Sequence, residues 1–182
     1  METTQINLLD LDYLKSNHTR IYYFGLGFIQ VVLNKYERIH FYTDELPTTN
    51  EDPHNHRYNF KSTILKGEFI NIKYKLVNGD SHILKNESCN ANIELNNKVE
   101  IPVGIELIST KTYKEGDSYY MFYNDFHGVA YKNNTITHLK RTDIITDYAQ
   151  VLYTKGVEEV CPFSNKIEEE KLWIIIDKII KS

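Results

Sequence analysis

Hydrophobic and polar residues alternate over short stretches through most of the chain between residues 19 and 156. Such alternation is typical of half-buried β-strands, because successive side chains point to opposite faces of a sheet. The clearest example runs from Phe69 to Val77. We expect further strands at residues 21–24, 28–33, 38–42, 54–65, 99–111, 117–123, 126–131, 134–141 and 148–154. Many short strands with frequent turns favour an all-β sandwich or barrel.

Both ends of the chain have a helical pattern instead. Residues 5–17 predict a short N-terminal helix within the segment 1–18, and residues 164–182 predict a longer C-terminal helix. Asn165 is the expected N-cap of that second helix, with Glu168 as its capping-box partner. An apolar stripe follows at Leu172, Ile175, Ile176 and Ile179, widened by Trp173 and Ile180. The stripe predicts a helix packed on the β-domain; a partner-binding helix is the alternative.

Glycine and polar clusters interrupt the strand pattern at three places. Gly25 and Gly27 are expected at bends or bulges. The Asn78-Gly79-Asp80 segment is typical of a hairpin turn. The polar stretch 81–98 predicts an irregular insertion at the rim of the barrel. No linker or repeat divides the sequence, so we expect residues 1–182 to form a single domain, with the barrel spanning 19–156.

Charge and cysteine usage restrict the class of protein. A net charge of −4 without a basic stripe argues against nucleic-acid binding. No apolar run approaches the ~20 residues that a bilayer span requires, which argues against a membrane protein. Cys89 and Cys161 are expected to be free thiols, as in the reducing cytoplasm. The sequence therefore predicts a cytoplasmic protein whose partner is a small molecule.

Two histidines lie two residues apart in the segment Asp52-Pro-His-Asn-His-Arg-Tyr58. On a strand, residues i and i+2 share a face, so His54 and His56 would direct two imidazoles to one point. Pro53 suits the start of such a strand, where its missing donor is tolerated. Neutral imidazoles are ligands for Fe, Zn, Ni and Cu alike. The alternative is that these histidines are only hydrogen-bonded residues of the barrel.

The surrounding residues resemble the two motifs of the cupin superfamily. His54, His56 and Gly67 match the first motif, Gly-x5-His-x-His-x3,4-Glu-x6-Gly. Gly116 and His127 match the second, Gly-x5-Pro-x-Gly-x2-His-x3-Asn. The resemblance implies a jelly-roll barrel, that is, a double-stranded β-helix, with His127 as the third metal ligand. It is strongest over residues 54–69 and 116–141.

Several motif positions are replaced in this chain. They are the first glycine, now Thr48; the glutamate ligand, now Phe60 or Lys61; and three positions of the second motif, now Phe122, Asn124 and Tyr131. Loss of the glutamate leaves three histidines and open coordination positions. This set is similar to that of the thiol dioxygenases of the cysteine dioxygenase type, which bind Fe(II) by three histidines. The resemblance implies one divalent metal, with Fe(II) preferred and Zn, Ni or Mn as alternatives.

Candidate substrate-contacting residues follow from strand parity. Arg38, His40 and Tyr42 share one face of a strand, so Arg38 is a candidate fork for a carboxylate or phosphate and His40 a candidate general base. A solvated polar face is the alternative. Tyr58 and Ser62 share the inward face with His56, and Arg57 would join them only through a bulge. Tyr123, like Tyr119 and Tyr131, lies on strands that carry the metal motif.

We thus predict His40, Tyr58 and Tyr123 as catalytic residues, Arg38, Arg57 and Ser62 as substrate-binding residues, and His54, His56 and His127 as metal ligands. The leading hypothesis is an Fe(II) dioxygenase acting on a small chelating, thiol-like substrate. A metal-dependent or metal-free sugar or nucleotide isomerase, epimerase or hydrolase is the second. A non-catalytic cupin that binds a small molecule is the third. Exposed edge strands would also suit a homodimer.

Overall fold

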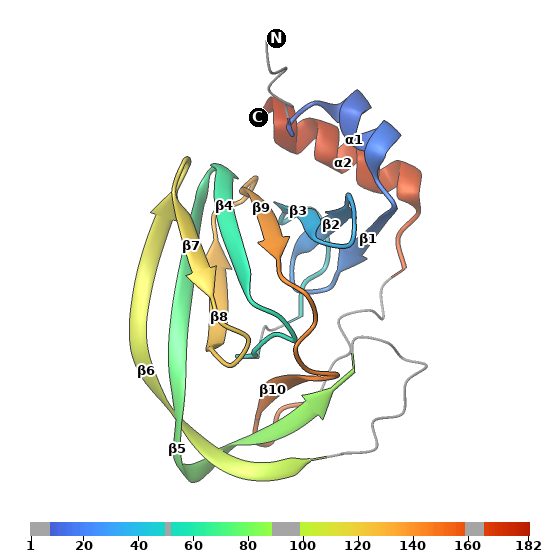
Figure 1. Ribbon diagram of the computed structural model, residues 1–182. Coiled ribbons are helices and arrows are strands. Elements are labelled where there is room, and N and C mark those ends of the chain that lie inside the picture. Colours follow the sequence, from blue (N-terminus) through green and yellow to red (C-terminus); the bar gives the residue numbers. More distant parts are fainter. Residues whose placement is uncertain (1–7, 50–51, 89–98, 159–165) are drawn as a thin grey trace.

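A computed structural model of the chain describes residues 8–49, 52–88, 99–158 and 166–182, in which two antiparallel sheets are accompanied by two helices (Figure 1). The elements in chain order are α1 (Leu11–Asn17), β1 (Arg20–Phe24), β2 (Phe28–Val32), β3 (Glu37–Tyr42), β4 (Phe60–Lys66), β5 (Glu68–Glu87), β6 (Glu100–Lys114), β7 (Ser118–Met121), β8 (Phe126–Tyr131), β9 (Ile136–Arg141), β10 (Ala149–Thr154) and α2 (Glu169–Lys181). The predominance of strands confirms the all-β expectation. Among the described residues neither sheet closes on itself, which is consistent with a β-sandwich, and the expected cupin-like jelly-roll barrel is not confirmed.

The first sheet has the strand order β1-β2-β3-β9-β4-β7 and is covered on both faces near β1–β3. Ile29, Ile39 and Phe41 point to one face and pack against helix residues such as Trp173 and Ile176. Figure 1 shows both helices on that side of β1–β3. The opposite face, with Phe28 and Tyr42, meets aromatic residues of the second sheet. Burial on two faces explains why every residue of β2 is buried.

Helix α2 confirms the predicted apolar stripe, but it begins later than expected. Leu172, Ile175 and Ile176 are buried, as are Trp173 and Ile179. The helix begins at Glu169, and the Glu168 side chain makes no capping bond, so the predicted capping box is not formed. The expected cap Asn165 lies outside the described residues. Three glutamates at positions 168–170 still suit the positive end of the helix dipole.

Helix α1 is also shorter than predicted. The Asp10 side chain accepts a hydrogen bond from the Tyr13 backbone N–H at 2.9 Å and starts the helix at Leu11. The expected start at residue 5 lies outside the described residues. Leu14 is the fully buried residue of α1, where it joins the core shared with α2. The short helix therefore serves to extend the core on the outer face of the first sheet.

The second sheet is built around the 20-residue strand β5. Strand β6 pairs along one side of β5, while β8 and β10 pair with successive halves of its other side. The predicted hairpin at Asn78-Gly79-Asp80 is wrong, because β5 continues and the register with β6 shifts between Val77 and His82. A Cβ on Gly79 would lie 2.9 Å from the Gly104 Cα. The glycines thus allow two backbones to pass closely at a bulge.

The predicted rim insertion at residues 81–98 is wrong in its first part. Residues 82–87 pair with β10, and Leu84 and Asn86 are buried. Polar side chains on these residues obscured a strand that is covered on one face only. Residues 89–98 lie outside the described residues, as do Cys89 and Cys161, whose expected free thiols therefore stay predictions.

Two glycines of the motif-like segments lie at sharp turns between strands. Gly67, between β4 and β5, has φ +83°, and Gly116, between β6 and β7, has φ +87°. Residues with a Cβ rarely adopt this conformation. At Gly67 a Cβ would also lie 2.6 Å from the Thr135 Oγ1 atom. These turns set the entry of β5 and β7 into the sandwich. Neither helix in the described parts of the chain is long and apolar enough to cross a bilayer.

Candidate metal centre

The strand predicted for residues 54–65 begins only at Phe60, and His54 is held by isolated β-bridges instead. The backbone N–H and C=O groups of His54 exchange two hydrogen bonds with His127 on β8, each of 2.9 Å. The preceding Pro53 carbonyl accepts a bond from the Leu152 N–H on β10 at 2.8 Å. This short segment is therefore fixed between β8 and β10, which places His54 beside His127.

Three imidazoles converge at this point. His54, His56 and His127 each offer a nitrogen, and these atoms all lie within 4.8 Å of one another. The Nε2 atoms of His56 and His127 are 2.9 Å apart. The ring of His54 has its centroid 5.0 Å from each of the other two rings. The three histidines predicted from the sequence therefore form one cluster that could hold a metal ion.

Hydrogen bonds orient two of the three rings. The Nδ1 atom of His127 lies 2.7 Å from the Oδ1 atom of Asn71 on β5. The amide nitrogen of Asn71 donates to the Met121 sulfur at 3.4 Å, which leaves the amide oxygen facing the imidazole. In His54, Nδ1 lies 3.1 Å from the Asp52 carbonyl oxygen. Both acceptors require a proton on Nδ1, so Nε2 of each ring is the unprotonated nitrogen, the form that can ligate a metal.

The surroundings keep these imidazoles neutral. Burial is the largest cause that lowers the pKa of each of the three histidines below the ordinary value of 6.5. For His56 the pKa is lowered further by the neighbouring imidazoles and by Arg38. For His127 the pKa is also lowered by His54 and Lys73. Because metal ligation needs the unprotonated ring, the cluster is ready for an ion at neutral pH.

No carboxylate or thiol joins the three histidines within the described parts of the chain. Phe60, one of the two positions that align with the glutamate of the resembled motif, lies against the cluster with its ring centroid 4.7 Å from that of His56. The Tyr119 ring lies edge-on to Phe60 at 6.1 Å between centroids. The ligand set is thus all-nitrogen and neutral, and it is bounded by apolar surface. Three ligands leave coordination positions open, and imidazole alone does not select the metal.

Tyr58 and Arg38 lie next to the cluster. The ring of Tyr58 has its centroid 5.8 Å from that of His56. The guanidinium carbon of Arg38 lies 5.3 Å from the Tyr58 ring centroid, and that of Arg141 lies 4.9 Å from it. Tyr58 therefore stands between the imidazoles and two arginines. Both predicted residues are in the neighbourhood that their proposed roles require, and the roles themselves stay predictions.

His40 and Ser62 lie deeper in the sandwich. The Nε2 atom of His40 is 3.0 Å from the Oε1 atom of Gln30, and burial lowers the pKa of His40 to about 3. Because the Gln30 oxygen accepts from Nε2–H, the unprotonated nitrogen of His40 is Nδ1, and a proton would be accepted there. Ser62 is buried on β4, where its strand neighbours are Leu139 and Tyr119.

Arg57 and Tyr123 contact the site through their backbones. The Arg57 carbonyl accepts hydrogen bonds from the N–H groups of Ile145 and Thr146. The Tyr123 carbonyl accepts from the His56 N–H at 3.3 Å, while its side chain is 36 % exposed. Both residues thus help to fix the loop that carries His56. Their proposed side-chain roles in substrate binding and catalysis remain predictions.

Two residues of this region were not found by sequence reasoning. Asn71 was visible as the polar member of the inward face that includes Phe69, but a single asparagine in an alternating strand has many possible roles. Arg141 belongs to no motif of the sequence. Its proximity to Arg38 depends on the pairing of β9 between β3 and β4, which no local pattern predicts. Comparisons with family models and with curated proteins find no match for this chain.

Proposed function

We propose that this chain is a cupin-like mononuclear metal enzyme, with Fe(II) as the preferred ion and dioxygenation of a small chelating substrate as its reaction. The observation that carries the proposal is the convergence of three neutral imidazoles without a carboxylate among the described residues. Two of these imidazoles carry their proton on Nδ1, which leaves Nε2 in the unprotonated form that ligation needs. A structural site would more commonly supply four protein ligands.

The residues of the chain have separable tasks in this proposal. His54, His56 and His127 would hold the ion, and Asn71 would orient His127. Phe60 would help to exclude water from the site, because its buried ring packs edge-on against His56. Fe(II) in such a site would supply the redox chemistry of a dioxygenase. For a thiol substrate, both atoms of O2 would be added to sulfur, taking R–SH to R–SO2H, with the four electrons supplied by that sulfur.

Arg38 and Tyr58 are the proposed substrate-facing residues. A guanidinium presents a planar fork to a carboxylate or phosphate. Arg38 lies over the Tyr58 ring, and that ring neighbours His56. A substrate held by Arg38 would therefore approach the open side of the cluster with its reactive group beside the Tyr58 ring. The tyrosine hydroxyl is the group of this chain that would carry a proton there.

The first experiment measures metal content in protein purified without chelator. We expect close to one metal ion per chain, and loss of that ion in His54→Ala and His127→Ala variants. His82→Ala is the matched control, because this histidine lies on β5 and interacts with Ser81 away from the cluster. Metal content that is absent from the wild type, or equal in all variants, would overturn the proposal.

The second experiment decides between oxidation and a Lewis-acid reaction. The Tyr58 ring beneath two arginines favours, as second candidate, an isomerase, epimerase or hydrolase that acts on a phosphorylated sugar or nucleotide. Oxygen uptake with a panel of small thiols is expected for the Fe(II)-loaded protein. Turnover that needs metal but persists without oxygen would favour the second candidate. Ligand binding that is unchanged in His54→Ala/His127→Ala, without turnover of any substrate, would favour a binding protein.

A further inference from the structure

The four arginines of the chain gather in one corner of the sandwich. Arg20, Arg38 and Arg141 line a pocket of about 190 Å³ between β1, β2, β3 and β9. The fourth, Arg57, is near enough to Arg141 to contribute to the lowering of its pKa, after the larger effects of burial and Arg38. By contrast, the 17 lysines, counted in the sequence, are spread over it. In a chain with net charge −4, this concentration of guanidinium groups requires an explanation.

None of the three pocket arginines forms an ion pair with a carboxylate of the described residues, although Asp143 is close enough to Arg141 to raise its pKa slightly against the larger lowering by burial and Arg38. Among the described residues, the ion pairs given by the structure are formed by lysines or by His18, and none includes an arginine. The pocket lining contains no carboxylate. The Nε atom of Arg141 is buried and has no hydrogen-bond partner. The guanidinium groups that line this concave site are therefore not ion-paired with any described carboxylate.

Aromatic rings hold these guanidinium groups in place. Arg38 and Arg141 both lie over Tyr58, at 5.3 and 4.9 Å from its centroid. Arg20 lies 6.0 Å from the centroid of Tyr22. Stacking on an aromatic face fixes the plane of a guanidinium while leaving its N–H groups available. The donors are thus oriented before any ligand arrives.

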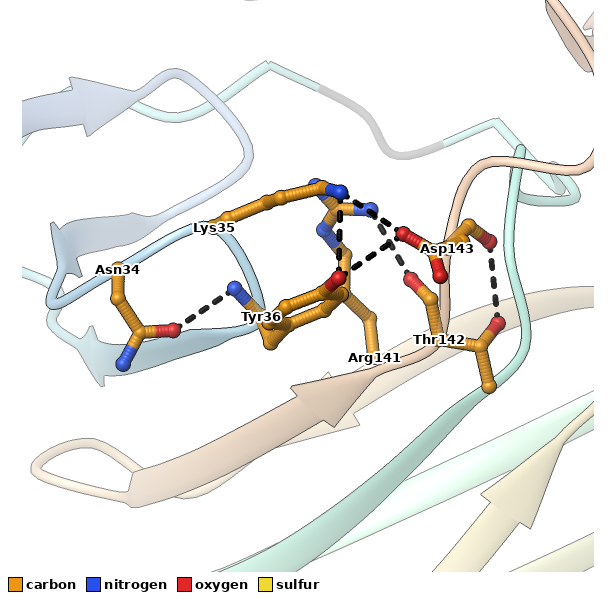
Figure 2. A network of polar contacts seen from close by, with 6 residues as sticks. All are labelled: Asn34, Lys35, Tyr36, Arg141, Thr142 and Asp143. Carbon is orange, nitrogen blue, oxygen red and sulfur yellow. Dashed lines mark hydrogen bonds and ion pairs between the residues drawn. The ribbon is translucent and has the colours of Figure 1, made fainter.

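The rim of the pocket is a network of polar contacts (Figure 2). The Lys35 ammonium donates to Asp143 at 2.9 Å and to the Tyr36 hydroxyl at 3.1 Å. Figure 2 shows the Arg141 side chain behind this network, with its guanidinium donating to the Thr142 carbonyl at 3.0 Å. The hydrogen bonds of Asp143 thus go to Lys35 and Tyr36, while Arg141 acts on this carboxylate only through its charge. The charge of Lys35 is paired at the rim, and no arginine of the pocket has an ion pair of this kind among the described residues.

We propose that this pocket binds a phosphate group, either free or as the terminal group of a small molecule. Three guanidinium groups match the charge of a dianion and the three oxygens of a phosphomonoester better than the single charge of a carboxylate. The pocket has room for roughly six water molecules at about 30 Å³ each, which suits one such group rather than a whole nucleotide. This site differs from the metal centre, and its ligand binding does not depend on the proposed reaction.

The two sites are neighbours through Tyr58. Arg38 and Arg141 both lie over its ring, and the ring centroid is 5.8 Å from that of His56. A small phosphorylated molecule anchored in the pocket would extend past Tyr58 towards the imidazoles. The same residues would thus select phosphorylated molecules as substrates of the metal centre. Phosphate binding itself can be measured without a metal.

The test is calorimetry on metal-free protein at fixed ionic strength. The probes are inorganic phosphate, glycerol phosphate, sulfate, acetate and succinate. We expect saturable binding of phosphate or glycerol phosphate, and weaker binding of both carboxylates. Tighter binding of glycerol phosphate than of inorganic phosphate would assign the group to a small molecule, and the reverse order would assign it to free phosphate. No phosphate binding at millimolar concentration, or equal binding of succinate, would overturn the proposal.

Variants locate the binding. Arg38→Gln and Arg141→Gln should each weaken phosphate affinity by about tenfold or more, because charged hydrogen bonds are lost. Lys140→Gln removes the same charge beside Arg141, but this lysine pairs with Glu37 and lies outside the pocket lining, so affinity should hold. Equal affinity in all three variants would overturn the proposal. So would a loss of phosphate binding in His54→Ala but not in Arg141→Gln.

One further measurement needs no variant and avoids any failure to fold. Arginine-specific modification by phenylglyoxal, read by mass spectrometry, should be slowed by phosphate at Arg38 and Arg141. Modification of Arg57, which does not line the pocket, should be slowed less. Equal rates with and without phosphate at all these residues would contradict the proposal.

Discussion

The Nε2 atoms of His56 and His127 face each other at 2.9 Å. His127 carries its proton on Nδ1 and donates a hydrogen bond from there to the Asn71 oxygen. Its Nε2 is therefore unprotonated and must accept the hydrogen bond from His56. In the metal-free protein His56 therefore carries its proton on Nε2 and donates it to His127. A metal ion bound by all three rings would take the place of that proton and require His56 to carry it on Nδ1 instead.

The first prediction is this change of tautomer at His56. Nitrogen NMR of histidine-labelled protein should show two Nδ1–H rings and one Nε2–H ring among the cluster before metal addition. After addition of diamagnetic Zn²⁺, all three rings should be Nδ1–H forms. A His56→Ala variant should lack the signal that changes. Three Nδ1–H rings in the metal-free protein would contradict the assignment.

Asn71 should act as a positioning residue for the metal. Asn71→Leu removes the acceptor for His127 Nδ1–H and leaves the three ligands in place, so metal affinity should fall by about 10- to 100-fold. Competition with a chromophoric chelator measures this fall, and circular dichroism checks the fold. Asn86→Leu is the matched control, because Asn86 is a buried asparagine of the same strand that bonds to Gln150. Equal losses in both variants would mean that Asn71 has only a structural role.

Phe60→Glu should make stability depend on metal. Phe60 is 2 % exposed, so an unpaired carboxylate there should cost about 3–5 kcal/mol in the metal-free protein. Zn²⁺ should restore much of this free energy of unfolding, because the carboxylate would lie beside the imidazoles. Phe60→Gln has the same length without the charge and should not be rescued. Urea denaturation with and without Zn²⁺ measures both effects, and equal rescue of the two variants would contradict this geometry.

Acidification should destabilise the fold through His40. Its pKa is about 3 in the folded protein and near 6.5 in the unfolded chain, so the unfolded state binds more protons between these values. The contribution of His40 is therefore fully present above pH 6.5 and is lost as the pH falls towards 3. The slope is up to about 1.4 kcal/mol per pH unit. His40→Leu should flatten the pH dependence of the unfolding free energy by this amount; an unchanged slope would show that His40 is protonated in the fold.

The two faces of α2 should respond differently to truncation. Ile176 is 0 % exposed, and Ile176→Ala should lower the free energy of unfolding by about 2–5 kcal/mol. Ile174 is 55 % exposed, and Ile174→Ala should change it by about 0.5 kcal/mol or less. Chemical denaturation measures both. Similar losses would mean that the helix does not pack on β1–β3 as described.

Sequence patterns predicted the features that depend only on which face of a single helix or strand is apolar. The stripe of Leu172 and Ile176 marks the buried face of α2 because helical side chains repeat every 3.6 residues. His54 and His56 were brought together by an argument from strand parity, yet His54 lies before β4 and is fixed by bridges to β8 and β10. The clustering was predicted, and its physical basis differs from the one assumed.

The sequence could not predict the features that depend on which strands pair. Asn71 contacts His127 because β5 pairs with β8, and Arg141 reaches Arg38 because β9 lies next to β3. The Asn78-Gly79-Asp80 segment has the composition of a turn, but pairing of residues 82–87 with β10 keeps β5 continuous. In each case tertiary pairing outweighs local preference.

The two backbone hydrogen bonds between His54 and His127 also constrain the order of folding. They join segments far apart in the sequence, and such contacts form late because the intervening chain must lose much of its entropy first. His54 and His56 alone supply a pair of ligands in the unfolded chain, whereas His127 joins them only when β8 has docked. Firm retention of an ion would therefore report that the sandwich has closed, and a chain stalled before that step would release its metal.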